Sequence, residues 1–389
     1  NIFKVFHIGH LMSNAIGESL SRLIEGSGAT VIRLCYPSDI GLHIAKSIWA
    51  MKKHSDEIPT DRTHIEERTT FLGKMYVEGT EAYEADASAK SEIDALNKVI
   101  YEKSDAEVNV LYDKGRKWSL EHFDLLYAVL GTSFNEFLYE SEMAPVGLEI
   151  VRAHIGKVFE ESEGAVVFKG EDHGLHTRVF INSHGLPTYE AKEMGLNETK
   201  FKKYSDATES IVVTANEQND YFRVILKALS LIDPNAGSKT KHIGHGLLRF
   251  ASGKMSSRKG NVVTAEQLIK DIKRMVMEKM TGREFSSDEL SEISDTVAIG
   301  AIKYTILRQA TGGDVIFDSS ASVSFEGDSG PYLQYATVRA NSILEKANQP
   351  SGDFAKSDSR FTINEGNTPN EVTLLEKLIS RFPDIVERA

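Results

Sequence analysis

The sequence predicts an α/β protein, with a parallel-sheet domain that carries a largely helical insertion and is followed by the start of an α-helical bundle. Three observations support this fold class. Apolar runs that end in polar residues alternate with helical segments in the first and the middle part of the chain. The charged stretch between these parts has apolar residues at helical spacing, and the last part of the chain is mostly helical in pattern.

Length and composition limit the class of protein before any motif is considered. The chain has 389 residues, more than one hydrophobic core usually serves, so two or three domains are expected. Hydrophobic residues make up 41% and charged residues 26% of the chain. Because no run approaches the roughly 20 apolar residues that a membrane span needs, we expect a protein that is neither membrane-embedded nor secreted.

Cysteine content and net charge narrow the class further. Cys35 is the single cysteine, so no internal disulfide can form, and no Cys/His spacing indicates a metal site. This usage is typical of a reducing compartment, and a cytoplasmic location is expected. The net charge of -12 argues against binding nucleic acid through overall basicity, so any RNA contact has to be local.

The first candidate site is the sequence His7-Ile8-Gly9-His10, where an extended run, Ile2 to Phe6, is expected to lead into a helix beginning near Leu11. A helix N-terminus presents unpaired backbone N–H groups, and its dipole favours negative charge. Two imidazoles three positions apart can both face an anion there, and Gly9 allows the backbone to approach it closely. The turn therefore predicts a phosphate site, with a solvated turn as the alternative.

The elements that follow predict a nucleotide-binding unit. Apolar residues recur at helical spacing from Ile16 to Ile24, and Gly26 with Gly28 predicts the end of this helix. Residues 29–36 are predicted to form a buried strand. A strand, a phosphate-facing turn, a helix and a second strand make the first half of an α/β unit that binds its ligand at the carboxyl ends of the strands.

The middle of the chain predicts an insertion and then the second half of the sheet. Residues 51–131 have apolar side chains at helical spacing among many charges, which indicates a helical insertion. Segments 165–169 and 177–182 are β-like, and the second half of the main sheet is expected to begin around residues 186–189. Ile211 to Val213 form the clearest buried strand, followed by polar residues and a helix.

A second candidate site follows residues 242–250. Residues 252–261, Ser-Gly-Lys-Met-Ser-Ser-Arg-Lys-Gly-Asn, combine small and polar residues with three cations. This composition predicts a mobile loop able to close over an anion, and an exposed basic loop is the alternative. The rest of the chain is predicted to be mostly helical, with an extended interruption at 314–319, a helix from Tyr332 and a loop over 348–368.

Together the two motifs resemble those of class I aminoacyl-tRNA synthetases, and specifically of arginyl-tRNA synthetases, over nearly the whole chain. That family has a His-x-Gly-His signature at the start of a Rossmann-type sheet and a Lys-Met-Ser-Lys loop after its last strand. Residues 7–10 and 254–257 correspond to these motifs. Three further stretches are similar to the arginine-specific branch: Asn1, Lys4 and Phe6 before His7; Pro187, Thr188 and Tyr189 with Glu193; and Phe325, Glu326 and Gly327 with Pro331, Tyr332, Gln334 and Tyr335.

The resemblance implies a division into domains. A Rossmann-type catalytic domain is expected over residues 1–312, with a connective insertion at 51–185, and a partial helical anticodon-binding domain over 313–389. The family also has an additional N-terminal domain and a longer C-terminal bundle. We therefore expect this sequence to be a fragment of a longer chain.

The implied reaction joins the carboxylate of arginine to the α-phosphate of ATP, releases pyrophosphate, and passes the arginyl group to tRNA(Arg). Mg²⁺ is carried with ATP, no protein metal site is expected, and a monomer is the expected state. Enzymes of this branch generally need bound tRNA before they activate arginine. Positioning and charge stabilisation dominate such phosphoryl chemistry. The implied catalytic residues, acting as cationic or donor groups, are His7, His10, Lys4 and Lys254.

One position departs from the family pattern, because Ser257 stands where the second lysine of the loop is expected. Some arginyl-type sequences that lack this lysine carry one just before the histidine signature, and Lys4 occupies that place. We therefore expect Lys4 to supply the missing positive charge. Lys259, two positions further along the loop, is the competing candidate.

The resemblance also implies ATP ligands at the sheet ends and on the loop. Glu217 takes the place of an acidic ribose ligand, and His245 with Gly246 precedes the loop, where the family holds adenine by backbone groups. A polar residue at a strand end can equally be satisfied by neighbouring backbone. The full implied set is Gly9, Glu217, His245, Gly246, Met255, Ser256 and Ser257.

The guanidinium of arginine favours a carboxylate, because the two groups form a strong bidentate pair. Glu193 is the expected partner, and Tyr189 shares its face if the segment is helical, since the two are four residues apart. By resemblance, Asn1 and Gln218 hold the amino-acid head group. The family more often has aspartate at the acidic position, and without the resemblance Tyr189 and Glu193 fit an ordinary surface pair.

Two other functions stay open at this point. A class I synthetase specific for lysine or another amino acid would keep the fold, and the stretches 187–193 and 325–335 argue against it. A non-catalytic, RNA-binding relative would keep the fold without the reaction. Intact His7, His10 and Lys254 argue against this alternative, whereas Ser257 favours it.

Overall fold

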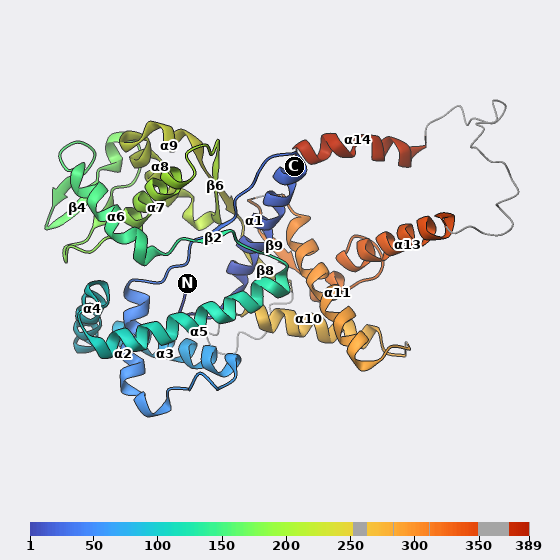
Figure 1. The fold of residues 1–389 in the computed structure, drawn as a ribbon, viewed down its shortest axis with the longest axis horizontal. Helices are drawn as coiled ribbons and strands as arrows, with labels where there is room; N and C mark the ends of the chain where they lie inside the picture. The colour runs from blue at the N-terminus through green and yellow to red at the C-terminus, as the bar shows by residue number, and fades with distance from the viewer. Residues whose placement is uncertain (252–262, 283, 311, 349–372, 389) are drawn as a thin grey trace, which may run out of the picture. The chain divides into compact units, whose positions relative to one another are not determined.

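The computed structural model describes residues 1–251, 263–282, 284–310, 312–348 and 373–388 (Figure 1). The chain divides into two compact units. The first unit comprises Asn1–Asn14, Ile32–Leu268 and Gln309–Ile316, and the second comprises Ala15–Val31, Ile269–Arg308 and Phe317–Ala389. Within the described ranges, no helix is both long and apolar enough to cross a membrane. The domain limits expected at residues 51, 185 and 312 stay predictions.

The N-terminal segment is a turn and not the extended run that the sequence predicts. Phe3 is fully buried and has a φ of 61°, and its backbone N–H donates to the Ser119 hydroxyl over 2.9 Å. Burying an aromatic side chain contributes roughly 2–3 kcal/mol, which offsets the roughly 1–2 kcal/mol that a left-handed residue costs. The helix that follows this turn, α1 (Ile8–Gly26), begins three residues earlier than predicted and ends at the predicted glycine.

The second predicted strand is shorter than expected, and it is not buried, because residues 29–36 are exposed or half-buried. β1 (Leu34–Cys35) pairs in parallel with β2 (Glu136–Phe137) over two residues. The Arg33 N–H donates to the Asn135 side chain over 2.7 Å instead of to a strand, so the ladder begins only at the next residue.

The predicted helical character of residues 51–131 is confirmed. The helices are α2 (Leu42–Lys53), α3 (Ile65–Ala85), α4 (Ala87–Glu102) and α5 (Ala106–Leu130), with a 3-10 turn at Ser55–Glu57. The Asp86 and Asp105 side chains cap α4 and α5 by accepting backbone N–H groups. The buried residues at helical spacing include Leu72, Met75, Ile93, Ile100, Val108, Trp118, Leu126 and Leu130.

α6 (Glu140–Ala153) and α7 (Tyr189–Lys203) pack closely against each other. Glycine makes this approach possible, because a Cβ at Gly147 would collide with the Ala191 carbonyl oxygen. A Cβ at Gly195 would likewise collide with the Met143 carbonyl oxygen. A side chain at either glycine would push the two helices apart.

Between α6 and α7 lies an antiparallel sheet of β3 (Glu160–Ser162), β4 (Ala165–Phe168) and β5 (Arg178–Ile181), with a 3-10 turn at Gly170–His173. The predicted β-like segments are thus confirmed. Residues 186–189, however, do not begin the second half of the main sheet. The chain reverses at Gly185, Pro187 makes only an isolated bridge to Ile181, and α7 starts at Tyr189. Pro187 has no N–H to extend a ladder.

The strand predicted at residues 211–213 is confirmed as part of β6 (Ser210–Ala215), which pairs in parallel with β7 (Thr240–His245). The side chains of β6 are half-buried, however, and not buried as predicted. A 3-10 turn at Asn216–Gln218, α8 (Asn219–Ile232) and α9 (Pro234–Lys239) connect the two strands. α8 buries its apolar face in a core shared with α6, α7, β4 and β5. This core includes Val151, Phe159, Phe168, Phe180, Met194, Phe222, Ile225 and Leu229.

β8 (Leu248–Phe250) pairs with β9 (Val315–Phe317), which confirms the predicted extended interruption. α10 (Ala265–Lys279) follows the second candidate loop, whose residues 252–262 lie outside the described residues. The loop expected over 348–368 lies outside them from residue 349 on.

The second unit contains α11 (Ser287–Leu307), α12 (Ser319–Ser322), α13 (Gly330–Asn348) and α14 (Leu374–Arg388), as the predicted helical pattern requires. Ser286 and Glu289 form a reciprocal capping box at the start of α11. α11 and α13 approach closely at Gly330, where a Cβ would collide with the Gly300 carbonyl. The Gln334 amide donates to the Thr296 carbonyl over 3.1 Å and fixes this contact.

Candidate functional site

His7 and His10 stack their imidazole rings at the start of α1, with centroids 3.7 Å apart. Burial lowers the pKa of both rings, and the positive charge of Lys4 lowers it further. Both imidazoles are therefore neutral near pH 7. Of the two roles expected for them, cation and donor, only the donor role is open.

The hydrogen bonds of this turn identify which nitrogen carries the proton. The Gly9 N–H donates to His7 Nδ1 over 3.1 Å, and the His7 N–H donates to His10 Nδ1 over 3.3 Å. A ring nitrogen that accepts a hydrogen bond has no proton, so the proton of each neutral ring is on Nε2. The turn thus presents two Nε2–H donors.

The backbone amides at the start of α1 already have acceptors. Ile8 N–H donates to the Val263 carbonyl over 3.3 Å, Gly9 N–H to the His7 ring, and His10 N–H to the His7 carbonyl over 3.0 Å. The expectation of unpaired N–H groups at this turn is therefore wrong, because the His7 side chain and residue 263 cap the helix.

Gly9 is explained by the fold of this turn. A Cβ at this position would lie 2.9 Å from Cε1 and 3.0 Å from Nδ1 of His7. Any side chain would displace the imidazole from the helix start. The absence of a side chain at Gly9 thus leaves room for the His7 ring to stack on the His10 ring.

The segment that follows the second motif is paired directly with the first motif. His7 and Thr264 form an antiparallel bridge, and the Ala265 N–H donates to the Phe6 carbonyl over 2.9 Å. His122 of α5 forms an ion pair with Glu266 in the first turn of α10, with 2.5 Å between Nε2 and Oε1. The residues that follow the second motif therefore lie against the turn at His7–His10, the signature turn. The motif residues Lys254, Met255, Ser256 and Ser257, and also Lys259, lie outside the described residues.

Lys4 precedes the signature turn, and its side chain extends to α3. Its Nζ is 4.4 Å from the ring centroid of Tyr76 on α3. Its charge acts on His7 and His10, whose pKa values it lowers. The Lys4 charge is therefore close enough to the two imidazoles to change their pKa values.

His245 is buried at the carboxyl end of β7, and both of its ring nitrogens have partners. Nδ1 donates to the Gly246 carbonyl over 2.8 Å, and Nε2 lies 2.8 Å from the Ser13 hydroxyl of α1. The ring therefore connects α1 to the end of β7. Gly246 is required by close packing, because a Cβ there would collide with the Gly313 carbonyl.

Glu217 and Gln218 are exposed in the 3-10 turn that follows β6. Ala215 at the end of β6 is in register with His245 at the end of β7. Because carboxyl ends of parallel strands meet at one edge, Glu217 and Gln218 share this edge with His245 and Gly246, as predicted.

Glu193 lies on the buried face of α7, and one of its two carboxylate oxygens is left without a hydrogen bond from the described residues. The residue is 9% exposed, and its Oε2 has no hydrogen-bond partner among the described residues. Burial raises the pKa of its carboxyl to about 7, although Lys200 and Lys192 lower it and Glu140 raises it. Such an unsatisfied buried carboxylate costs free energy until a cationic donor reaches it.

Three charged neighbours of Glu193 were not predicted from the sequence. Glu140 opens α6 and Lys192 precedes Glu193 on α7, and their side chains form a buried ion pair of 2.5 Å. Lys192 also donates to the Ile40 carbonyl over 3.3 Å. Lys200 is buried on α7 and its pKa is lowered by burial to about 8. Only the glycine-mediated crossing of α6 and α7 brings Glu140 here, and the two glycines were the available signal.

Two phenols complete the surroundings of Glu193. Burial raises the pKa of Tyr36 and of Tyr221, and the Glu193 charge raises both further. The Tyr36 hydroxyl is buried without a hydrogen-bond partner in the described part of the chain. A ligand here would therefore meet a carboxylate oxygen and a hydroxyl that both lack partners.

Tyr189 and Asn1 are less enclosed than Glu193. Tyr189 begins α7, which confirms its four-residue helical spacing from Glu193, but it is 51% exposed. The Lys192 ammonium lies 4.4 Å from the centroid of its ring. Asn1 is exposed.

A cavity of about 410 Å³ lies in the second unit, lined by Tyr304, Glu326, Gly327, Asp328, Ser329, Tyr332 and Leu333. No predicted site residue lines it. In the part of the chain that the structure describes, no three His, Cys, Asp or Glu residues are arranged to hold a metal ion.

Comparisons with known proteins agree with one another. The family described as tRNA synthetases class I (R), catalytic domain, matches residues 1–319. Arginine–tRNA ligase from Borreliella afzelii is 32% identical over 358 residues, which cover 90% of this chain and 60% of that protein. The arginine–tRNA ligase of Treponema denticola is 30% identical over 395 residues, which cover all of this chain and 66% of that protein.

Two solved structures share the fold. The arginyl-tRNA synthetase of Plasmodium falciparum matches with a TM-score of 0.73 and 22% identity, covering 99% of this chain and 63% of that one. The arginyl-tRNA synthetase of Thermus thermophilus matches with a TM-score of 0.75 and 22% identity, covering 99% and 68%. This chain thus spans about 60% of the length of the first of the curated relatives.

Proposed function

This chain belongs to the arginine branch of the class I tRNA synthetases, and on this premise we propose that it activates arginine with ATP and transfers the arginyl group to tRNA(Arg). The single observation that supports the arginine part of the proposal most strongly is the buried Glu193 carboxylate, whose Oε2 lacks a partner among the described residues. The ATP part is supported by the pairing of the His7–His10 turn with residues 263–265.

Glu193 is the proposed partner of the substrate guanidinium. A guanidinium supplies two parallel N–H donors and a positive charge, which are what a buried carboxylate lacks. The compact ammonium of lysine cannot form the same parallel pair, so geometry favours arginine. Tyr189 is proposed to line the side-chain site, and Asn1 with Gln218 to hold the amino-acid head group.

In the proposed adenylation step, an oxygen of the arginine carboxylate attacks the α-phosphorus of ATP. The bond from that phosphorus to the bridging oxygen of pyrophosphate breaks. The Nε2–H groups of His7 and His10 donate to phosphoryl oxygens, where negative charge must be stabilised. Lys4 and Lys254 supply positive charge, and Mg²⁺ arriving with ATP neutralises part of the triphosphate charge.

The remaining ATP contacts are proposed along one sheet edge and the second motif. Glu217 accepts from the ribose hydroxyls, and the backbone at His245 and Gly246 meets the adenine, because the His245 ring is already bonded to Ser13 and Gly246. Gly9 contributes by keeping the His7 ring in place. Met255, Ser256 and Ser257 are proposed to close over the nucleotide.

Lys4 is proposed to replace the lysine that Ser257 lacks. Its placement beside the two imidazoles supports this role, since its charge already acts on them. Lys259 is the competing candidate. In this role, the folded residues of the first unit would hold the Lys4 charge in place.

The proposal extends to the whole enzyme. After adenylation, a ribose hydroxyl of the terminal tRNA adenosine attacks the arginyl carbonyl and AMP leaves. Residues 1–312 are proposed to form the catalytic domain with an insertion at 51–185, and 313–389 to begin the anticodon-binding domain. A monomer acting in the cytoplasm, where tRNA charging serves translation, is part of the proposal.

ATP–pyrophosphate exchange tests the proposal. The assay is run with tRNA(Arg) present and with arginine, lysine or citrulline as the amino acid. Exchange is expected with arginine only. Citrulline has the shape of arginine without its charge, so exchange with citrulline at a similar rate would exclude a charge-based site, and exchange with lysine alone would overturn the assigned substrate.

A further inference from the structure

The segment before the signature turn, residues 1–6, is held by two helices of the insertion. The Phe3 N–H donates to the Ser119 hydroxyl of α5 over 2.9 Å, and the Phe3 ring packs so closely on Gly115 that a Cβ there would collide with it. On α3, a Cβ at Gly73 would lie 3.0 Å from the Val5 side chain. The insertion thus determines the path of the chain into His7.

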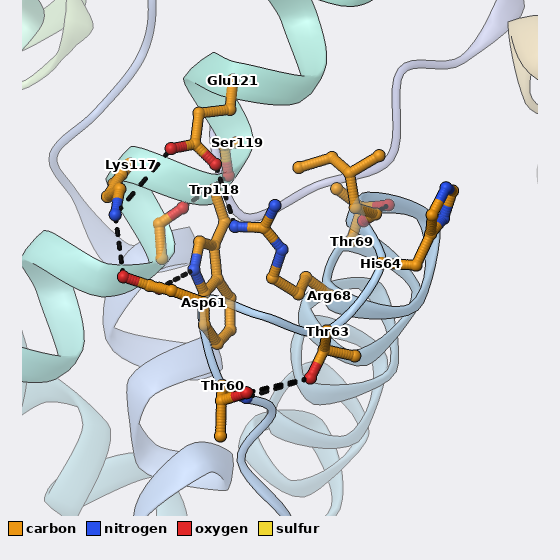
Figure 2. A network of polar contacts seen from close by, with 12 residues as sticks. Thr60, Asp61, Thr63, His64, Arg68, Thr69, Lys117, Trp118, Ser119 and Glu121 are labelled. Atoms are coloured by element: carbon orange, nitrogen blue, oxygen red, sulfur yellow. Dashed lines mark hydrogen bonds and ion pairs between the residues drawn. The ribbon is translucent and has the colours of Figure 1, made fainter.

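α3 and α5 are in turn fixed to each other by a network of charged and aromatic side chains (Figure 2). Asp61, just before α3, accepts the Trp118 indole N–H over 2.7 Å and pairs with Lys117 over 2.8 Å. Arg68 of α3 pairs with Glu121 of α5 over 2.9 Å. Trp118 is fully buried and Arg68 is 9% exposed, so these two side chains fix α3 against α5.

Lys4 points from residues 1–6 toward α3. Its Nζ lies 4.4 Å from the centroid of the Tyr76 ring, a distance at which an ammonium is attracted to the face of an aromatic ring. Burial raises the pKa of the Tyr76 phenol, but Lys4, with smaller contributions from Thr80 and Lys46, lowers it, and the net shift is downward. The two side chains therefore interact electrostatically.

We propose that Tyr76 is a positioning residue for Lys4, which it holds with its charge intact beside the His7–His10 turn. This inference rests on the proposed function, in which Lys4 supplies positive charge to the transferring phosphoryl group. It assigns the helical insertion a direct part in adenylation, through one side chain of α3.

The chemistry of the partner explains why an aromatic ring suits this position. A lysine side chain has four flexible bonds, and restricting them before the reaction lowers the entropic cost of placing the charge. A carboxylate partner would restrict them too, but it would also neutralise the charge that the phosphates need. The face of a phenol attracts the ammonium weakly and leaves its charge available.

The test compares three variants in ATP–pyrophosphate exchange with arginine and tRNA(Arg) present. Tyr76→Leu removes the ring and is expected to lower kcat by about two- to thirtyfold, the range of a cation–π contact. Tyr76→Phe keeps the ring and should stay within about twofold of the unchanged protein. The control is Tyr83→Leu, because Lys46 lies 4.5 Å from the Tyr83 ring on the same helix, and no change in exchange is expected.

A double-mutant cycle with Lys4→Ala separates positioning from a loss of stability. If Tyr76 acts through Lys4, adding Tyr76→Leu to Lys4→Ala has no further effect on the residual rate. Melting temperatures of Tyr76→Leu and Tyr83→Leu are compared alongside, to identify a general loss of fold. Additive effects of the two substitutions, or equal losses in Tyr76→Leu and Tyr76→Phe, would overturn the inference.

Failure of this inference can be distinguished from failure of the proposed function. If Lys4→Ala lowers exchange strongly and Tyr76→Leu leaves it unchanged, Lys4 keeps its role and Tyr76 loses the one proposed here. If Lys4→Ala itself has no effect, the role proposed for Lys4 fails and this inference fails with it.

Discussion

The signature turn is half-buried and the Glu193 site is buried, and the pKa values of both are shifted, but they differ in how far the protein satisfies their hydrogen-bonding groups. At His7 and His10, burial lowers the pKa of the rings, and backbone N–H groups donate to both Nδ1 atoms. At Glu193, burial raises the pKa to about 7, and Oε2 has no partner in the described part of the chain.

This difference indicates two kinds of preparation for a ligand. The turn is complete without ATP and needs only to donate two N–H groups, so its geometry costs little to maintain. The Glu193 site is incomplete without a cation, so binding there gains whatever the empty site has lost by burial. Under the proposed function, phosphate binding would thus be built into the fold, whereas amino-acid selection would depend on an unsatisfied charge.

The largest expected effect concerns the positive charge beside the turn. Because the two imidazoles are neutral, Lys4 is the cation that the described part of the site contributes, and Lys4→Ala is expected to abolish pyrophosphate exchange, with a loss of about a thousandfold or more. Lys259→Ala should lower exchange only a few-fold. Equal, mild losses in both variants would remove Lys4 from the proposed mechanism.

Glu193→Gln should affect the amino acid much more than the nucleotide. Glutamine keeps the size of the side chain but offers no charge to a guanidinium, so the Kd for arginine should rise by about a hundredfold or more. The KM for ATP should change by less than about threefold, because the signature turn is satisfied independently. Calorimetry and exchange kinetics measure the two quantities.

The matched control for this variant is Glu190→Gln. Glu190 is buried on the same helix, but its carboxylate pairs with Arg178 inside the protein over 3.1 Å. Arginine affinity should therefore change little in Glu190→Gln. An equal loss of affinity in both variants would indicate a general disturbance of α7 instead of a guanidinium site at Glu193.

The smallest expected effect is on stability without ligands. The Glu193 pKa is raised from 4.5 to about 7 in the folded chain, so the folded state binds more protons than the unfolded state between these values. The Glu193 contribution to the free energy of unfolding therefore falls as the pH rises from about 4.5 through 7. Relative to the unchanged protein, Glu193→Gln should gain a few degrees in melting temperature between pH 5 and pH 7.5. A constant difference across this range would contradict the raised pKa.

Sequence reasoning predicted the parts of the fold that depend on local periodicity. The helices within residues 51–131 and the strand around Val212 follow from the pattern of apolar residues. The helix that carries Tyr189 and Glu193 was considered only as a condition for their four-residue spacing. The predictions for Ile2–Phe6 and for residues 186–189 were wrong. In the first, burial of Phe3 against Gly115 overrides local preference, and in the second a proline limits the ladder.

The chemical state of the candidate site could not be predicted from spacing. The neutral imidazoles follow from ring stacking and from amides that donate to Nδ1, which are properties of the folded turn. Glu140 and Lys192 are 52 residues apart and meet only because α6 and α7 cross at two glycines. Resemblance to the family could therefore predict which residues form the site, but not their protonation states.

The proton balance of arginine binding near pH 7 tests the proposed guanidinium site at Glu193 most directly. Calorimetry in two buffers of different ionisation enthalpy measures how many protons leave the protein as arginine binds. With a Glu193 pKa of about 7, and an ionised carboxylate required by the guanidinium, about half a proton should be released per arginine at pH 7, and none in Glu193→Gln. Release of no proton by the unchanged protein, or the same release by the variant, would contradict the account.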